Sequence, residues 1–148
     1  MFASILVGTD GSDTAAVAVA HAIRLARSLD ARLQIVSAYE PVAERSLRVQ
    51  HLQAPADVQW TVNPREDVLE LLESAKRDAE AAEVGSIETF ARVGDAADAI
   101  LDVAEEQKSD LIVIGNKGMT GATRFLLGSV PNKISHHAPC SVLIVRTS

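Results

Sequence analysis

Two patterns of apolar residues alternate along this chain of 148 residues. Short apolar runs rich in β-branched side chains are typical of strands, and apolar residues spaced three and four apart are typical of helices with one buried face. The helical spacing is clear at Ala15, Val19, Ala22 and Ala26, and it recurs between residues 68 and 82. The strand pattern predicts five strands, at residues 5–7, 33–38, 87–93, 111–114 and 142–145.

Helix start signals support the helices between these strands. We expect Asn63 to cap the second helix, with Pro64 at its first position and Glu66 completing a capping box. Asp95 is the expected cap of the third helix, and the fourth begins near Ser129. Strands and helices therefore alternate from one end of the chain to the other.

This alternation predicts a mostly parallel sheet with helices on both faces, because parallel strands need long crossover connections. Right-handed crossovers make it a single doubly wound α/β domain over residues 1–148. Residues 111–114 are apolar throughout and predict a central strand, whereas Glu88 and Arg92 make 87–93 alternate like an edge strand. The stretch 40–63 is predicted to be a long irregular loop.

Charge and composition narrow the function. The chain has 14 basic and 20 acidic residues, a formal net charge of -6, which disfavours nucleic acid and anionic membranes as partners. Its apolar runs are far shorter than the roughly 20 residues of a membrane span, and its start lacks the basic region of a signal peptide. The single Cys140 cannot form an internal disulfide. We expect a cytoplasmic protein.

Polar residues follow the first predicted strand, where Gly8, Thr9, Asp10, Gly11 and Ser12 come in succession. In an open α/β sheet, ligands bind beyond the carboxyl ends of the strands. An aspartate there can accept hydrogen bonds from a ribose or an adenine amine, or it can hold a metal. Asp10 and Ser12 could equally do no more than cap the first helix. The residues alone leave both interpretations open.

A second group of residues, which we call the glycine pattern, consists of Gly115, Gly118, Gly128 and Ser129. The first two glycines follow a predicted strand and allow the backbone to approach a ligand closely. The last two residues begin a helix, whose free N–H groups attract anions. Because Pro131 has no N–H, Ser129 and Val130 would supply the donors, and Lys117 and Arg124 could add positive charge. Neither the P-loop nor the dinucleotide fingerprint is present, so this is a different phosphate site.

The glycine pattern matches G-x2-G-x9-G-[ST], and with it the chain resembles the nucleotide-binding members of the universal stress protein family. The resemblance covers nearly the whole chain, including the opening segment with Asp10 and the closing segment from Leu126 to Arg146. It implies the strand order 3-2-1-4-5 and an ATP-like nucleotide between the ends of strands one and four. By the same resemblance, adenine and ribose would lie against Gly8, Thr9, Asp10 and Ala38, and the phosphates against Gly115, Asn116, Lys117, Gly118, Gly128, Ser129, Val130 and Pro131.

With that strand order, the apolar last strand, from Val142 to Val145, lies at an edge of the sheet, where unpaired backbone groups invite another strand. We therefore expect an antiparallel homodimer through this strand. We expect no metal site at His136 and His137, whose side chains diverge on a helix, and Cys140 is interpreted as a core residue.

Three functional hypotheses follow. The first is a module in stress response or signalling that binds an adenine nucleotide (ATP, AMP or cyclic AMP) and has no fast catalytic activity. The second is slow ATP hydrolysis or phosphotransfer, with Mg²⁺ bridging the phosphates and Asp10. The third is a nucleotide-free domain that acts through protein interactions.

Overall fold

The computed structural model describes residues 1–40, 64–116 and 127–147. Five parallel strands form one sheet in the order β3-β2-β1-β4-β5, which confirms the predicted fold class and strand order. The strands are β1 (Ser4–Gly8), β2 (Arg32–Tyr39), β3 (Ile87–Val93), β4 (Leu111–Gly115) and β5 (Ser141–Val145). The helices are α1 (Asp13–Leu29), α3 (Arg65–Ala81), α4 (Ala96–Glu106) and α5 (Ser129–His137). The predicted 40–63 loop lies outside the described residues, apart from Glu40.

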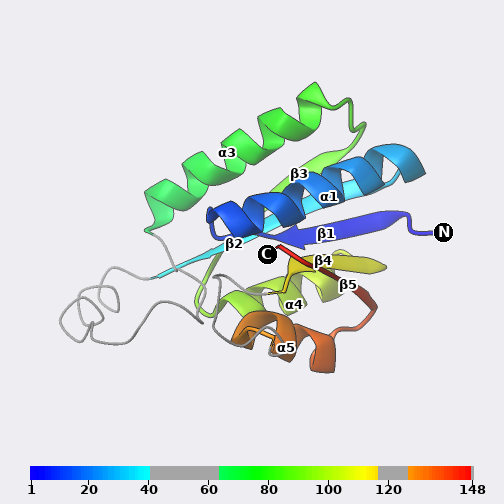
Figure 1. Ribbon diagram of the computed structural model, residues 1–148. Coiled ribbons are helices and arrows are strands. Elements are labelled where there is room, and N and C mark those ends of the chain that lie inside the picture. Colours follow the sequence, from blue (N-terminus) through cyan, green and yellow to red (C-terminus); the bar gives the residue numbers. More distant parts are fainter. Residues whose placement is uncertain (41–63, 117–126, 148) are drawn as a thin grey trace.

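The helices form a layer on each face of the sheet. Figure 1 shows α1 and α3 above the strands and α4 and α5 below them. The chain therefore leaves β1 toward one layer and leaves β4 toward the other. Because β1 and β4 are neighbours, the winding reverses between them, and this is the point at which open α/β sheets bind their ligands.

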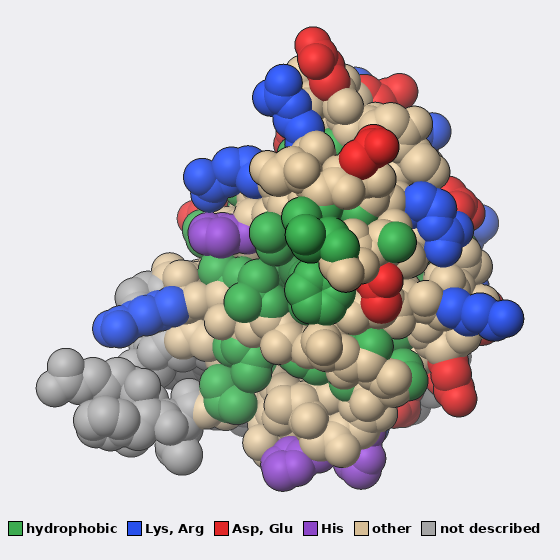
Figure 2. All heavy atoms as spheres, turned by 90° about the vertical axis from the view of Figure 1, so that its right-hand side faces the viewer, with side chains coloured by type: hydrophobic (Ala, Val, Ile, Leu, Met, Phe, Trp, Pro, Cys, Tyr) green, Lys and Arg blue, Asp and Glu red, His purple; other side chains and the backbone are tan. Residues whose placement is uncertain are grey.

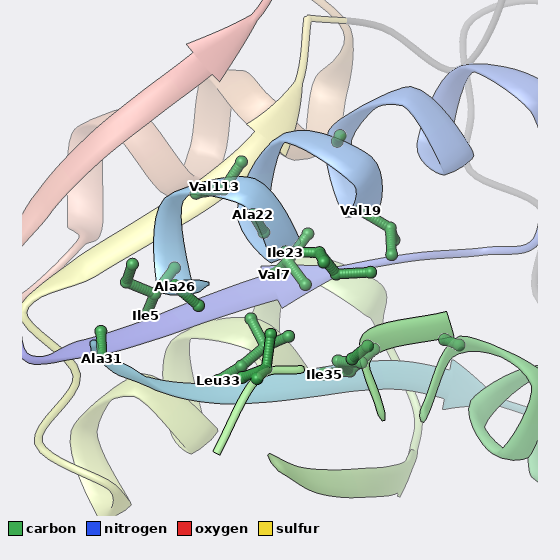
Figure 3. Packing of buried hydrophobic residues seen from close by; sticks show 14 of the residues in the cluster. Ile5, Val7, Val19, Ala22, Ile23, Ala26, Ala31, Leu33, Ile35 and Val113 are labelled. Atoms are coloured by element: carbon green, nitrogen blue, oxygen red, sulfur yellow. The ribbon is translucent and has the colours of Figure 1, made fainter. Parts of the chain in front are cut away.

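Each helix layer covers its own hydrophobic core. Above the sheet, Ile5 and Val7 of β1 pack with Leu33 and Ile35 of β2 beneath α1 (Figure 3). Below it, β1 turns Leu6 toward α4 and α5, because successive side chains of a strand point to opposite faces. A fully buried side chain of this size contributes about 1.5–3 kcal/mol. The two cores hold the carboxyl ends of the central strands in a fixed frame.

The helix starts agree with prediction in two cases and differ in a third. Asp95 caps α4, where its Oδ2 accepts the Asp98 N–H at 3.0 Å, and α5 begins at Ser129. The prediction for α3 was wrong: Pro64, at φ -60° and ψ 154°, is extended and precedes the first helical residue, Arg65. Proline provides no side-chain cap there, and Asn63 lies outside the described residues.

The two edge strands of the sheet are partly exposed to solvent. β3 and β5 are the edge strands, as predicted, and Leu143 on β5 is 38% exposed. Figure 2 views the side on which the N-terminus lies, where the strands begin, and shows hydrophobic side chains at its centre among scattered charges. Within the parts of the chain described here, no helix is long and apolar enough to cross a membrane.

Candidate functional site

The carboxyl ends of β2, β1 and β4 lie next to one another. Gly8, the last residue of β1, pairs with Val36 on one side, and Val7 pairs with Val113 on the other. Since neighbouring strands are about 4.8 Å apart, the ends of β2 and β4 are separated by only about 10 Å across β1. Residues that follow all three strands can therefore contact one small ligand.

The loop after β1 is held by its own hydrogen bonds. Thr9 and Asp10 are buried, and the Thr9 N–H donates to Val36 O at 3.0 Å. The Asp10 carboxylate accepts the Ser12 N–H at 2.9 Å, and Ser12 Oγ caps α1 by accepting the Ala15 N–H at 3.2 Å. The capping interpretation is thus confirmed for Ser12. Asp10 supports the loop through at least one oxygen, and its contact with a ligand stays a prediction.

Small residues lie on the α4 and α5 side of these strand ends. Ala38 is buried, and its side chain belongs to the core between the sheet and α4. Gly8 falls on this same face, since it alternates with Val7 on the opposite one, and it carries no side chain. The predicted adenosine-binding residues Gly8 and Ala38 therefore contribute little side-chain volume on the α4 and α5 side of the sheet.

The structure brings the two ends of the glycine pattern together. Gly115 ends β4, and the carbonyl of the next residue, Asn116, accepts the Gly128 N–H at 3.0 Å. The backbone that follows β4 therefore lies directly against the start of α5, although residues 117–127 separate the two in the sequence. Lys117 and Gly118 lie outside the described residues, as does Arg124.

The first turn of α5 is suited to an anion. Gly128 is the N-cap, and its carbonyl accepts the Asn132 N–H at 3.0 Å. The N–H groups of Ser129 and Val130 precede the first intrahelical bond and have no acceptor within the helix, and Pro131 has no N–H. This turn contains no acidic residue, whereas the first turns of α1, α3 and α4 each contain at least one. No carboxylate in this turn therefore compensates the positive end of the helix dipole.

An ion pair ties α5 to α4. Lys133 Nζ lies 2.7 Å from Asp98 Oδ1 and 3.6 Å from Asp95 Oδ2, both at the start of α4. The hydrogen bond with Asp98 raises the pKa of Lys133, so this lysine is charged at neutral pH. The groups are exposed, so water screens their attraction, but the pair joins the two helices on this face.

Asn116 is built into the structure through its side chain as well. Its Oδ1 accepts the backbone N–H of Thr147 at 3.0 Å and the Thr147 hydroxyl at 2.8 Å. Sequence reasoning missed Thr147 altogether, because a threonine after the last strand carries no recognisable signal. Asn116 therefore contacts the chain beyond β5 at the same time as it contacts α5.

Two further features of the structure are a cysteine and a hollow between α1 and α3. Cys140 is half-buried against the lower core, and burial raises the pKa of its thiol, which makes it a poor nucleophile at neutral pH. Among the residues that the structure describes, no three His, Cys, Asp or Glu side chains gather in a way that could hold a metal ion. A hollow of about 400 Å³ lies between α1 and α3, and it is lined by Ala20 and Ser74 and also by Thr9 and Gly11 of the loop after β1. Its two helices cover the opposite face of the sheet from α5.

Comparisons with known proteins point to one family over nearly the whole chain. The sequence model of the universal stress protein family matches residues 1–146. A universal stress protein of Mycobacterium tuberculosis is 38% identical over 147 residues, covering 99% of this chain and 98% of the relative. A putative universal stress protein of Staphylococcus aureus is 35% identical, covering 99% of this chain and 85% of the relative.

Solved structures give the same result. A universal stress protein crystallised in complex with cAMP superimposes with a TM-score of 0.74 at 33% identity, covering 99% of both chains. The universal stress protein UspA of Lactobacillus plantarum has a TM-score of 0.76 at 24% identity, covering 98% of both chains, and supports the fold alone. The match of the family model and of these relatives over nearly the whole length shows that the chain belongs to the universal stress protein family.

Proposed function

We propose that this protein is a cytoplasmic module of stress response or signalling that binds an adenine nucleotide. The phosphates would contact the backbone after β4 and the first turn of α5, and the adenosine would lie against the ends of β1 and β2. The observation that carries the proposal is the 3.0 Å hydrogen bond from Gly128 N–H to Asn116 O, which joins the two halves of the glycine pattern beside the end of β1.

The chemistry of the α5 start supports a phosphate at this place. Two N–H groups, the Ser129 hydroxyl and the positive end of the helix dipole are available within one turn, without a carboxylate in that turn. Such a local device suits a small anion, because it does not depend on the overall charge, which is -6. A polyanion would need a broad basic surface instead.

The adenosine half of the proposal draws support from the small residues and from a relative. Gly8 and Ala38 contribute little side-chain volume on the face of the sheet that α4 covers, next to the loop that contains Asp10. The universal stress protein that is 33% identical to this chain was solved with cAMP, an adenine nucleotide. We therefore propose cyclic AMP, AMP and ATP as the ligands to test.

Calorimetric titration of the three nucleotides tests this function. Gly128 has φ -62° and ψ 165°, values that valine adopts readily, so Gly128→Val should fold and place a side chain in the phosphate site. We expect the unaltered protein to bind at least one nucleotide and Gly128→Val to bind none. The matched control is Gly85→Val, because an added Cβ at Gly85 meets nothing within 4 Å. No binding by the unaltered protein, or equal binding by Gly128→Val, would contradict the proposal.

Slow ATP hydrolysis and a nucleotide-free interaction domain can each be tested separately. Slow hydrolysis predicts Mg²⁺-dependent release of phosphate from ATP that disappears in Asp10→Ala. A nucleotide-free interaction domain predicts that the purified protein releases no adenine absorbance on denaturation. Among the described residues, neither of these hypotheses is supported by a contact as direct as the hydrogen bond between Gly128 and Asn116.

We also propose that two copies pair through β5. This strand is at the edge of the sheet, and alternate residues, among them Leu143, face solvent. An unpaired edge with apolar side chains is the kind of surface that strand pairing covers.

A further inference from the structure

Three segments of the chain meet at Asn116. Its N–H donates to Val145 O at the end of β5 at 2.9 Å, and its carbonyl accepts the Gly128 N–H at the start of α5 at 3.0 Å. Its side-chain Oδ1 accepts both the N–H and the hydroxyl of Thr147, at 3.0 Å and 2.8 Å. Asn116 thus links the end of β4 to the edge strand, to the chain beyond it and to α5.

These bonds hold Asn116 in place. A carboxamide oxygen has two lone pairs, and Thr147 uses both. Asn116 is therefore anchored at three points: its side chain by Thr147, its N–H by Val145 and its carbonyl by Gly128.

Gly128 depends on this carbonyl because it has no side chain with which to cap α5. The structure shows no side-chain hydrogen bond at the start of this helix, unlike α1 and α4, where Ser12 and Asp95 provide one. The backbone bond to Asn116 is thus what orients the residue just before the free N–H groups of Ser129 and Val130.

We infer that Thr147 and Asn116 are positioning residues for the phosphate site: the chain beyond β5 holds Asn116, and Asn116 holds the first turn of α5 in the geometry that binds phosphate. This inference rests on the proposed function. It assigns the Asn116 side chain to Thr147 instead of to the ligand, and it gives the C-terminal segment a part in nucleotide affinity. By thermodynamic reciprocity, a bound nucleotide also stabilises the contact of Thr147 with Asn116.

The test compares three variants in calorimetry with ATP, AMP and cyclic AMP. Thr147→Val has nearly the same shape and loses only the hydroxyl, so we expect its affinity to fall about 2- to 10-fold, the range for one hydrogen bond. Thr147→Ser keeps the hydroxyl and should restore the affinity. Ser135→Ala is the matched control, because it also removes a 2.8 Å hydroxyl bond, to Asn132 O, but one that does not involve Asn116.

Hydrogen exchange of the nucleotide-free protein adds a measurement that does not depend on binding. Thr147→Val should speed exchange of the Gly128 amide, whereas Ser135→Ala should not. Unchanged affinity in Thr147→Val would overturn the inference, even if exchange at Gly128 increased, because the contact would then be structural only. If the unaltered protein bound no nucleotide, the proposed function would fail, and exchange at Gly128 would still decide whether Thr147 controls the start of α5.

Discussion

Gly11 holds the loop after β1 in a conformation that other residues adopt at a cost. Its φ is +84°, in the left-handed region, and the loop carries Thr9 and Asp10. A Cβ added at Gly11 would lie 3.4 Å from Leu71 Cδ2, which is an ordinary contact, so the strain comes from the backbone alone. We therefore expect Gly11→Ala to destabilise the fold through its dihedral angle.

The magnitude follows from comparison with a second glycine. Left-handed backbone costs an L-residue about 1–2 kcal/mol, whereas any glycine to alanine change stabilises by about 0.4–1 kcal/mol through the unfolded chain. Gly85 has no such φ and an added Cβ meets nothing within 4 Å, so Gly85→Ala has only the second effect. Because that effect is common to both variants, Gly11→Ala should be less stable than Gly85→Ala by about 1–2 kcal/mol.

Urea denaturation measures this difference directly, and melting temperatures should differ by about 2–8 °C for a domain of this size. Gly94→Ala separates the two possible causes, because Gly94 has φ +109° but an added Cβ there meets nothing within 4 Å. It should lose stability as Gly11→Ala does. Equal stability of all three variants would show that a positive φ at Gly11 and Gly94 imposes no such cost on alanine.

Three further predictions concern assembly and ionisation. Leu143→Lys should convert a dimer into a monomer in light scattering, whereas Val17→Lys on α1, at 37% exposure against 38% for Leu143, should leave the mass unchanged; a monomeric unaltered protein would contradict pairing through β5. Since burial raises the pKa of the Cys140 thiol, its alkylation by iodoacetamide should need a higher pH in the folded protein than in urea, and equal midpoints would count against this burial. The hydrogen bond with Arg92 lowers the pKa of Glu106. The pair therefore stabilises the fold at pH values above the ordinary carboxyl pKa of about 4.5, and this stabilisation is lost as the pH falls through the lowered pKa. The small difference in melting temperature between the unaltered protein and Glu106→Gln at neutral pH should therefore vanish in acid, and a difference that persisted there would refute this pairing.

The strands and helices were predictable because their residues follow the period of the element that they form. Residues 111–114 are apolar throughout, as a strand covered on both faces must be, and the structure buries β4 completely. The cap at Asp95 was predictable because capping depends on residues close in the sequence. The sheet order followed from the resemblance, and the sequence pattern alone did not supply it.

Contacts between distant residues account for what the sequence did not reveal. Gln34 is a polar residue within a strand, yet it is fully buried, where its Oε1 accepts the hydroxyls of Ser4 and Ser109. The link between Asn116 and Thr147 has the same character, because nothing in the local pattern of either residue indicates a partner. Pairings of this kind depend on which segments the fold brings together, so they appear only in three dimensions.

We propose that nucleotide phosphates bind at the start of α5, and backbone amide shifts in a nitrogen-15 NMR titration show whether they do. On addition of cyclic AMP or ATP, the amides of Ser129 and Val130 should shift most, together with Gly115 at the end of β4. The amides of Ala20 and Ser74, in the hollow between α1 and α3, should stay in place. Shifts confined to α1 and α3, or no shifts at any residue with either nucleotide, would contradict phosphate binding at the start of α5.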